Sequence, residues 1–116
     1  MMDIRNFYNA AGGDYATVFR RIPSDELIGN FLLRFSSDPT YGELTEARAR
    51  ESAEEIYRAA HALKGLASVL GLKKLALAAD ELAERARLTG APPDGKYFQA
   101  VTDEYTRVVG LITRMI

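Results

Sequence analysis

Apolar residues recur at three- and four-residue steps along most of the chain, which is the spacing of one face of a helix. A first stripe begins after Ser24, a favourable N-cap residue, and is predicted to be buried. The same spacing predicts three longer helices over residues 52 to 70, 72 to 86 and 98 to 115. The stripe after Ser24 consists of Ile28, Phe31, Leu32 and Phe35.

Two shorter segments repeat this spacing less strongly, and we expect them to form accessory helices. One runs from Tyr15 to Ile22. The other runs from Tyr41 to Arg50, is more polar, and has Leu44 as its main apolar contact. Ser52 and Glu55 form a capping-box pattern at the start of the long helix that follows.

Turn signals separate the predicted helices, and no run of alternating β-branched residues suggests a strand. The signals are Gly12-Gly13, Pro23, Asp38-Pro39, Gly71 and the segment 90–95. We therefore predict an all-α fold, an antiparallel four-helix bundle of up-down-up-down order with short accessory helices at its N-terminus. The bundle core is expected over residues 24 to 115 and the accessory helices over residues 1 to 22.

Composition narrows the class of protein without naming a partner. The 116 residues are the size of one domain, so we expect a single domain over residues 1 to 116, and a monomer. The net charge of -1 gives no reason to expect binding to nucleic acid or to a membrane surface. The chain has no cysteine, no apolar leader after Met1 and no stretch of ~20 apolar residues, which favours the cytoplasm. Met1 suggests a free-standing protein, although a module of a longer kinase is the alternative.

His61 is the only histidine, and its position on the long helix predicts that its side chain faces solvent. At about 100° per residue, His61 lies roughly 200° from Leu63 on a helical wheel. The predicted core arc contains Ile56, Ala59, Leu63, Leu66, Ala67 and Leu70. The opposite arc contains Glu54, Tyr57, Arg58, His61, Lys64, Gly65 and Ser68.

Lys64 and Gly65 lie one turn beyond His61 and change how the histidine is interpreted. A lone histidine is usually structural, and an exposed lysine usually serves solubility. Glycine inside a helix, however, costs about 1 kcal/mol relative to alanine, so something should compensate for it. An outward-facing glycine lets a partner approach closely, whereas the alternative is tight packing within the chain.

An imidazole with a reference pKa of about 6.5 is mostly neutral at cytoplasmic pH and offers a nitrogen lone pair to phosphorus. Phosphoryl transfer requires mainly in-line positioning and charge neutralisation. The lysine cation is suited to offsetting phosphoryl charge. A protein that presents such a histidine can therefore leave the metal and the acidic cluster to its partner.

The segment from His61 to Gly71, HALKGLASVLG, resembles the signature of histidine-containing phosphotransfer (HPt) domains, approximately H-x-L-K-G-x-A-x-x-x-G. The resemblance implies a four-helix bundle that relays a phosphoryl group between receiver-domain aspartates and has no cofactor or metal of its own. It implies that His61 is the phosphoacceptor, Lys64 its basic neighbour and Gly65 the residue that permits receiver docking. Gly71 would end the helix. Ser68 would either hydrogen-bond a phosphoryl oxygen or simply be tolerated.

The segment departs modestly from the family pattern, and other classes of protein compete with this interpretation. Leu66 and Val69 stand where smaller or more polar residues are common, which bears on partner identity. A two-metal bundle needs Glu-x-x-His pairs, but Arg58 precedes His61 at that spacing. A kinase would need a glycine-rich phosphate loop, which the chain lacks. The remaining rival is a non-phosphorylated helical adaptor that binds a signalling partner through Tyr57, Arg58, Lys64 and Gly65.

Overall fold

A computed structural model describes residues 2–115, so both ends of the predicted domain, Met1 included, lie outside the described residues. The described part of the chain contains seven helices and no strand, which confirms the all-α fold class. The helices are α1 (Ile4–Ala11), α2 (Tyr15–Arg21), α3 (Asp25–Ser36), α4 (Thr40–Ala49), α5 (Ala53–Val69), α6 (Lys73–Thr89) and α7 (Gly95–Thr113).

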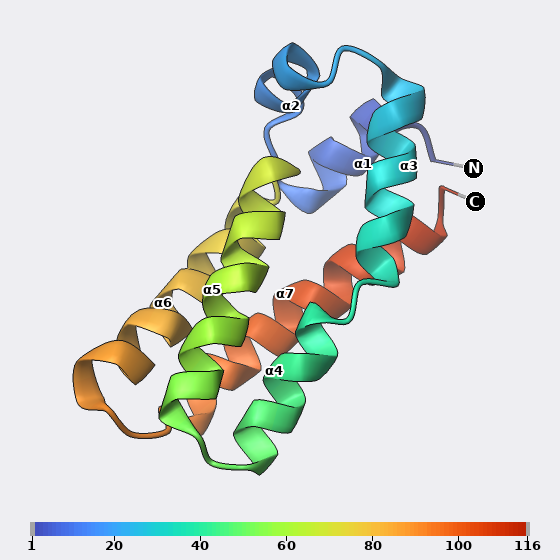
Figure 1. Ribbon diagram of the computed structural model, residues 1–116. Helices are drawn as coiled ribbons and strands as arrows, with labels where there is room; N and C mark the ends of the chain where they lie inside the picture. The colour runs from blue at the N-terminus through green and yellow to red at the C-terminus, as the bar shows by residue number, and fades with distance from the viewer. Residues whose placement is uncertain (1, 116) are drawn as a thin grey trace.

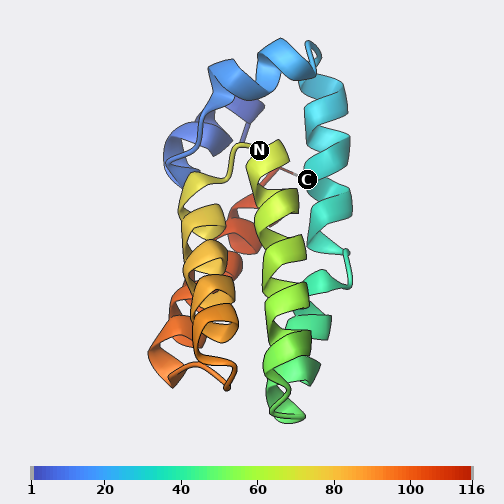
Figure 2. The ribbon, with the colours of Figure 1, turned by 60° about the vertical axis from the view of Figure 1, so that its left-hand side comes forward.

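Helices α3 and α4 follow one another along one side of the molecule, and α5, α6 and α7 then alternate in direction beside them (Figures 1 and 2). Together, α3 and α4 therefore form the first of the four helical segments of an up-down-up-down bundle. Helix α5 packs against both α4 and α6, and α7 closes the bundle against α6 and α3. No helix within residues 2–115 combines the length and the apolar character that crossing a membrane would require.

Helix α4 belongs to the bundle, so the prediction that residues 41 to 50 form an accessory helix is wrong. Leu44 and Ala47 are both buried against the neighbouring helices. The ring of Tyr41 stacks on Tyr105 of α7, with centroids 3.9 Å apart and planes at 4°. The break between α3 and α4 occurs where Asp38 accepts a hydrogen bond from the Thr40 N–H (2.9 Å). A polar exposed face made α4 look peripheral, although its narrow apolar stripe is covered.

The N-terminal helices also contribute to the core, which therefore extends beyond the predicted residues 24 to 115. Phe7 and Tyr8 of α1 are fully buried. The Tyr8 hydroxyl donates to the carbonyl of Leu70 at the end of α5 (2.6 Å). The Asp14 N–H donates to the carbonyl of Gly71 (3.2 Å), so the segment before α2 clamps the α5–α6 turn. In the sequence, Ile4, Phe7, Tyr8 and Ala11 follow the spacing of one helical face, but a pattern of eight residues does not show that this helix packs into the bundle core.

At the start of α5, one of the two hydrogen bonds of the predicted capping box forms. The Ser52 hydroxyl accepts a hydrogen bond from the Glu55 N–H (3.2 Å), as an N-cap should. The Glu55 carboxylate accepts instead from the Arg50 Nε (2.9 Å) and not from Ser52. At the other end of the helix, Gly71 has φ +66°, a left-handed conformation that glycine adopts without strain. Gly71 thus ends the α5 segment as predicted.

Candidate functional site

His61 lies near the middle of α5, and its side chain is exposed as the helical wheel predicts. Leu63, on the opposite side of the helix, is 1% exposed and anchors α5 in the core. The predicted core arc omits Ala60, which is fully buried, and includes Leu66, which is only half-buried, because α5 contacts α6 more closely than α3. The imidazole is therefore presented to solvent by a helix whose other face is fixed.

Tyr57, one turn before His61, is half-buried and stacks on the imidazole. The two ring centroids are 5.6 Å apart, and the ring planes differ by 18°. Stacking of this kind restricts rotation of the smaller ring while leaving its nitrogen atoms accessible at the edge. Tyr57 thus acts as a support for the orientation of His61.

Lys64, one turn after His61, forms an ion pair with a residue that the sequence analysis did not identify. Its ammonium lies 3.0 Å from a carboxylate oxygen of Asp80 on α6, and the two side chains are 40% and 42% exposed. Asp80 directly follows the buried Ala79, at the edge of the α6 core stripe. This edge position is the one sign in the sequence that Asp80 could contact a neighbouring helix. Only the packing of α6 on α5 shows that the residue it faces is Lys64.

The charged network continues along α6 away from Lys64. Arg87 donates two hydrogen bonds to the Glu84 carboxylate (3.3 and 2.7 Å). The hydrogen bond from Arg87 is the main reason that the pKa of Glu84 is lowered, and Lys64 contributes in the same direction. Asp80 opposes this pKa change, so the four charges act on one another across the α5–α6 face.

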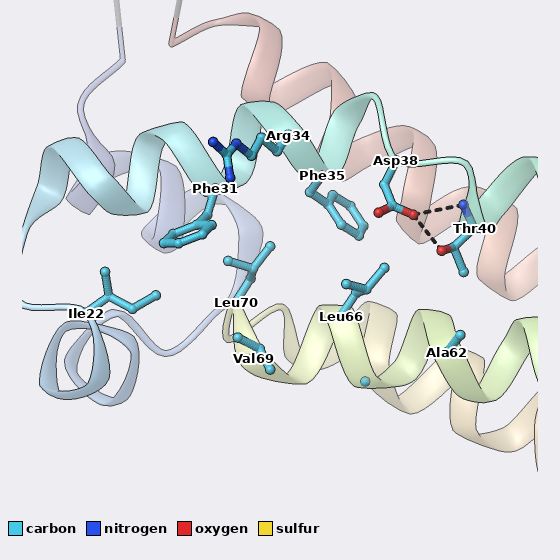
Figure 3. A pocket seen from close by; sticks show the side chains of 11 residues that line it. Ile22, Phe31, Arg34, Phe35, Asp38, Thr40, Ala62, Leu66, Val69 and Leu70 are labelled. Atoms are coloured by element: carbon cyan, nitrogen blue, oxygen red, sulfur yellow. Dashed lines mark hydrogen bonds between the residues drawn. The ribbon is translucent and has the colours of Figure 1, made fainter.

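Gly65 is exposed, and apart from its chain neighbours and the adjoining backbone of α5, nothing within residues 2–115 would lie within 4 Å of a Cβ added there. The alternative that this glycine serves tight packing within the chain is therefore wrong. Gly65 instead borders a groove of about 640 Å³ between α3 and α5. Figure 3 shows side chains of both helices facing each other across it. The groove is lined by Ile22, Phe31, Arg34, Phe35, Asp38, Thr40, Ala62, Gly65, Leu66, Val69 and Leu70.

The lining of the groove explains one error in the predicted core. Phe31 was expected to be buried but is 40% exposed, because α3 and α5 separate at this end of the bundle. Val69 of α5 is 53% exposed near the same opening. The groove therefore presents apolar surface to solvent within one turn of His61, since Ala62 and Gly65 form part of its wall.

Arg58 and Ser68 do not contact the charged network of Lys64. Arg58 lies one turn before His61, as Lys64 lies one turn after it. Arg58 is ion-paired with Glu54 on the exposed face of α5 and borders a second hollow, between α4 and α5. Ser68 is exposed two turns beyond His61 and faces the α2–α6 end of the bundle. Its hydroxyl has no hydrogen bond within residues 2–115.

The arrangement around His61 combines a small number of chemical features. It offers an accessible imidazole, a stacked ring that orients it, a nearby ammonium and an open surface beside it. Within residues 2–115, no three His, Asp or Glu side chains lie close enough together to hold a metal ion.

Comparison with known proteins identifies one family. A family model described as the Hpt domain matches residues 32–110, which contain the His61 segment and most of the bundle. No match was found among curated proteins or among solved structures.

Proposed function

Because the chain belongs to the Hpt domain family, whose members are phosphotransfer carriers of two-component signalling, we propose that it relays phosphoryl groups between receiver domains through His61. The exposure of the His61 side chain, in the middle of the matched range, is the observation that carries this proposal. Its family implies receiver domains as partners.

In the proposed step, the unprotonated ring nitrogen of His61 attacks the phosphorus of a receiver aspartyl phosphate. The new N–P bond forms as the O–P bond to the aspartate breaks, and the aspartate leaves as a carboxylate. The imidazole becomes cationic and retains the proton on its other nitrogen until solvent removes it. Attack of a second receiver's aspartate on the same phosphorus reverses these changes and restores His61.

The neighbours of His61 are assigned complementary roles. Tyr57 holds the imidazole edge toward the incoming phosphorus through the 5.6 Å stack. Lys64 offsets part of the phosphoryl charge, since residues three apart on a helix lie side by side. Arg58, which is paired with Glu54, and Ser68, two turns from His61, are proposed only as contacts at the edge of a docked receiver. The metal and the acidic residues that catalyse transfer belong to the receiver.

The groove beside Gly65 is the proposed docking surface for the receiver. It adjoins His61 on the same helix, and it exposes Phe31 and Val69 to solvent. Partly exposed aromatic and aliphatic groups in a groove are typical of protein contact sites. The missing side chain at Gly65 lets a partner's backbone come close to α5 without displacing any atom of this chain.

Transfer from a phosphorylated receiver domain to the purified protein tests the proposal. We expect labelled phosphate to move onto the wild-type chain and not onto His61→Gln, which keeps a polar side chain but has no ring nitrogen. Lys64→Ala should slow transfer while receiver binding stays nearly unchanged. Label on both the wild type and His61→Gln, or on neither of them, would overturn the proposal. Binding of a receiver without any label would favour the adaptor function.

A further inference from the structure

The proposed function requires the positive charge of Lys64, and in this structure Asp80 already forms an ion pair with that charge. The ammonium and the carboxylate are 3.0 Å apart, and roughly two fifths of each side chain is exposed. A lysine ammonium has three donors but a single compact charge, and the Asp80 carboxylate offsets part of that charge. Lys64 therefore cannot keep this contact with Asp80 and also give its full charge to a phosphoryl group on His61.

We propose that Asp80 is a positioning residue that holds the Lys64 ammonium while His61 is unphosphorylated and releases it when the phosphoryl group arrives. This inference rests on the proposed function of His61. It adds a residue on α6 to a site that otherwise consists of α5 side chains. When His61 is phosphorylated, Lys64 thus exchanges its ion pair with Asp80 for one with the phosphoryl group.

Charge favours this exchange. A phosphoryl group carries about −1.5 to −2 charges near neutral pH, whereas the carboxylate carries one. An ion pair that is open to solvent is weak, so little opposes its exchange for a stronger one. The lysine stem has four flexible carbons and starts one turn from His61, so a side-chain rotation without helix movement is sufficient.

The other charges on this face do not take the place of Lys64. Arg87 is held by Glu84 through two hydrogen bonds, on the part of α6 beyond Asp80. Arg58 is paired with Glu54 on α5. Among these cations, Lys64 is the one whose carboxylate partner comes from the neighbouring helix while its own position is one turn from His61.

The exchange predicts a direction for the effect of Asp80. Its carboxylate stabilises the unphosphorylated protein through Lys64, and it repels the phosphoryl group in the phosphorylated one. Asp80→Asn should therefore shift the transfer equilibrium toward phosphorylated His61 by about two- to fivefold, the range expected of an exposed pair. Asp80→Glu should behave like the wild type. If the pair only joined α5 to α6, Asp80→Asn would change the melting temperature but not the transfer equilibrium.

Nuclear magnetic resonance of the Lys64 side chain tests the exchange directly. The chain has four lysines, so Lys64→Arg assigns the signal by its disappearance. His61 is phosphorylated with phosphoramidate, and the phosphorus spectrum reports formation of phosphohistidine. We expect Asp80→Asn to move the Lys64 signals in the unphosphorylated protein. After phosphorylation, we expect the wild type and Asp80→Asn to give the same Lys64 signals.

The control and the contrary outcomes are distinct. Glu81→Gln removes an exposed charge from the adjacent position of α6 and should change neither the Lys64 signals nor the equilibrium. If phosphohistidine forms while the Lys64 signals of the wild type stay dependent on Asp80, the positioning role is overturned and the proposed function stands. If no phosphohistidine forms at His61, the proposed function and this inference both fail.

Discussion

The ring of Tyr57 and the imidazole of His61 stack with their planes at 18° and their centroids 5.6 Å apart. Both residues lie on the same face of α5, one turn apart, and Tyr57 is the more buried of the two. The contact links the exposed imidazole to a ring that packs partly against the bundle core.

Replacement of Tyr57 should loosen His61 without unfolding the bundle. Tyr57→Ala removes the ring current above the imidazole, so the carbon-bound protons of His61 should shift in the proton spectrum and transfer should slow several-fold. Tyr57→Phe keeps the stack and serves as the control. Unchanged His61 signals in Tyr57→Ala would show that the two rings do not stack in solution.

Gly65→Gln should stabilise the protein and weaken receiver binding. Apart from its chain neighbours and the adjoining backbone of α5, no atom within residues 2–115 lies within 4 Å of an added Cβ, and glutamine is a better helix former than glycine by about 0.5–1 kcal/mol. Urea unfolding and a binding titration measure the two effects. Gly110→Gln is the matched control, because Gly110 lies in α7, is exposed, and has equally open space around it. It should stabilise to a similar extent and bind normally. Equal binding by both variants would argue against docking at Gly65.

Gly71→Ala should be among the most destabilising single changes in the chain. A Cβ there would lie 2.5 Å from Val18 Cγ2 and 3.1 Å from the Asp14 carbonyl, and φ is +66°. Left-handed strain and overpacking together cost about 3 kcal/mol. Gly90→Ala shares the left-handed backbone, with φ +63°, but meets no atom within 4 Å in residues 2–115. Its cost should be about 1 kcal/mol. Chemical denaturation of both variants separates the packing effect from the backbone effect. Equal losses of unfolding free energy would contradict the overpacking expected at Gly71.

Tyr8→Phe should destabilise the fold by about 1–2 kcal/mol, since the buried hydroxyl donates to the Leu70 carbonyl. Burial also raises the pKa of Tyr8 well above its ordinary value. In the unfolded chain the phenol ionises near pH 10, whereas in the folded protein it stays protonated. The contribution of Tyr8 to stability is thus complete below about pH 10 and is lost as the pH rises beyond it.

The wild type should accordingly lose stability more steeply above pH 10 than Tyr8→Phe does. Unfolding curves at several alkaline pH values compare the two proteins. Parallel pH profiles would indicate that the hydroxyl of Tyr8 is not buried in solution.

Local periodicity determined much of the fold and the position of His61. A helix repeats every 3.6 residues, so the spacing of Leu63 and its neighbours decides which face is buried before any packing is known. The exposure of His61 and its proximity to Lys64 follow from the same local rule, and the end of the helix segment at Gly71 follows from the preference of glycine for a left-handed turn. The resemblance of this segment to a phosphotransfer signature is likewise a property of the sequence.

Tertiary structure decided how separate helices meet. Asp80 lies 16 positions after Lys64, and only the packing of α6 on α5 brings the two charges to 3.0 Å. Phe31 lies on the apolar stripe of α3, but the separation of α3 from α5 leaves it in an open groove. Tyr8 reaches Leu70 because α1 folds back onto the end of α5. Such contacts depend on the distances and angles between helices, which a single helix's hydrophobic pattern does not contain.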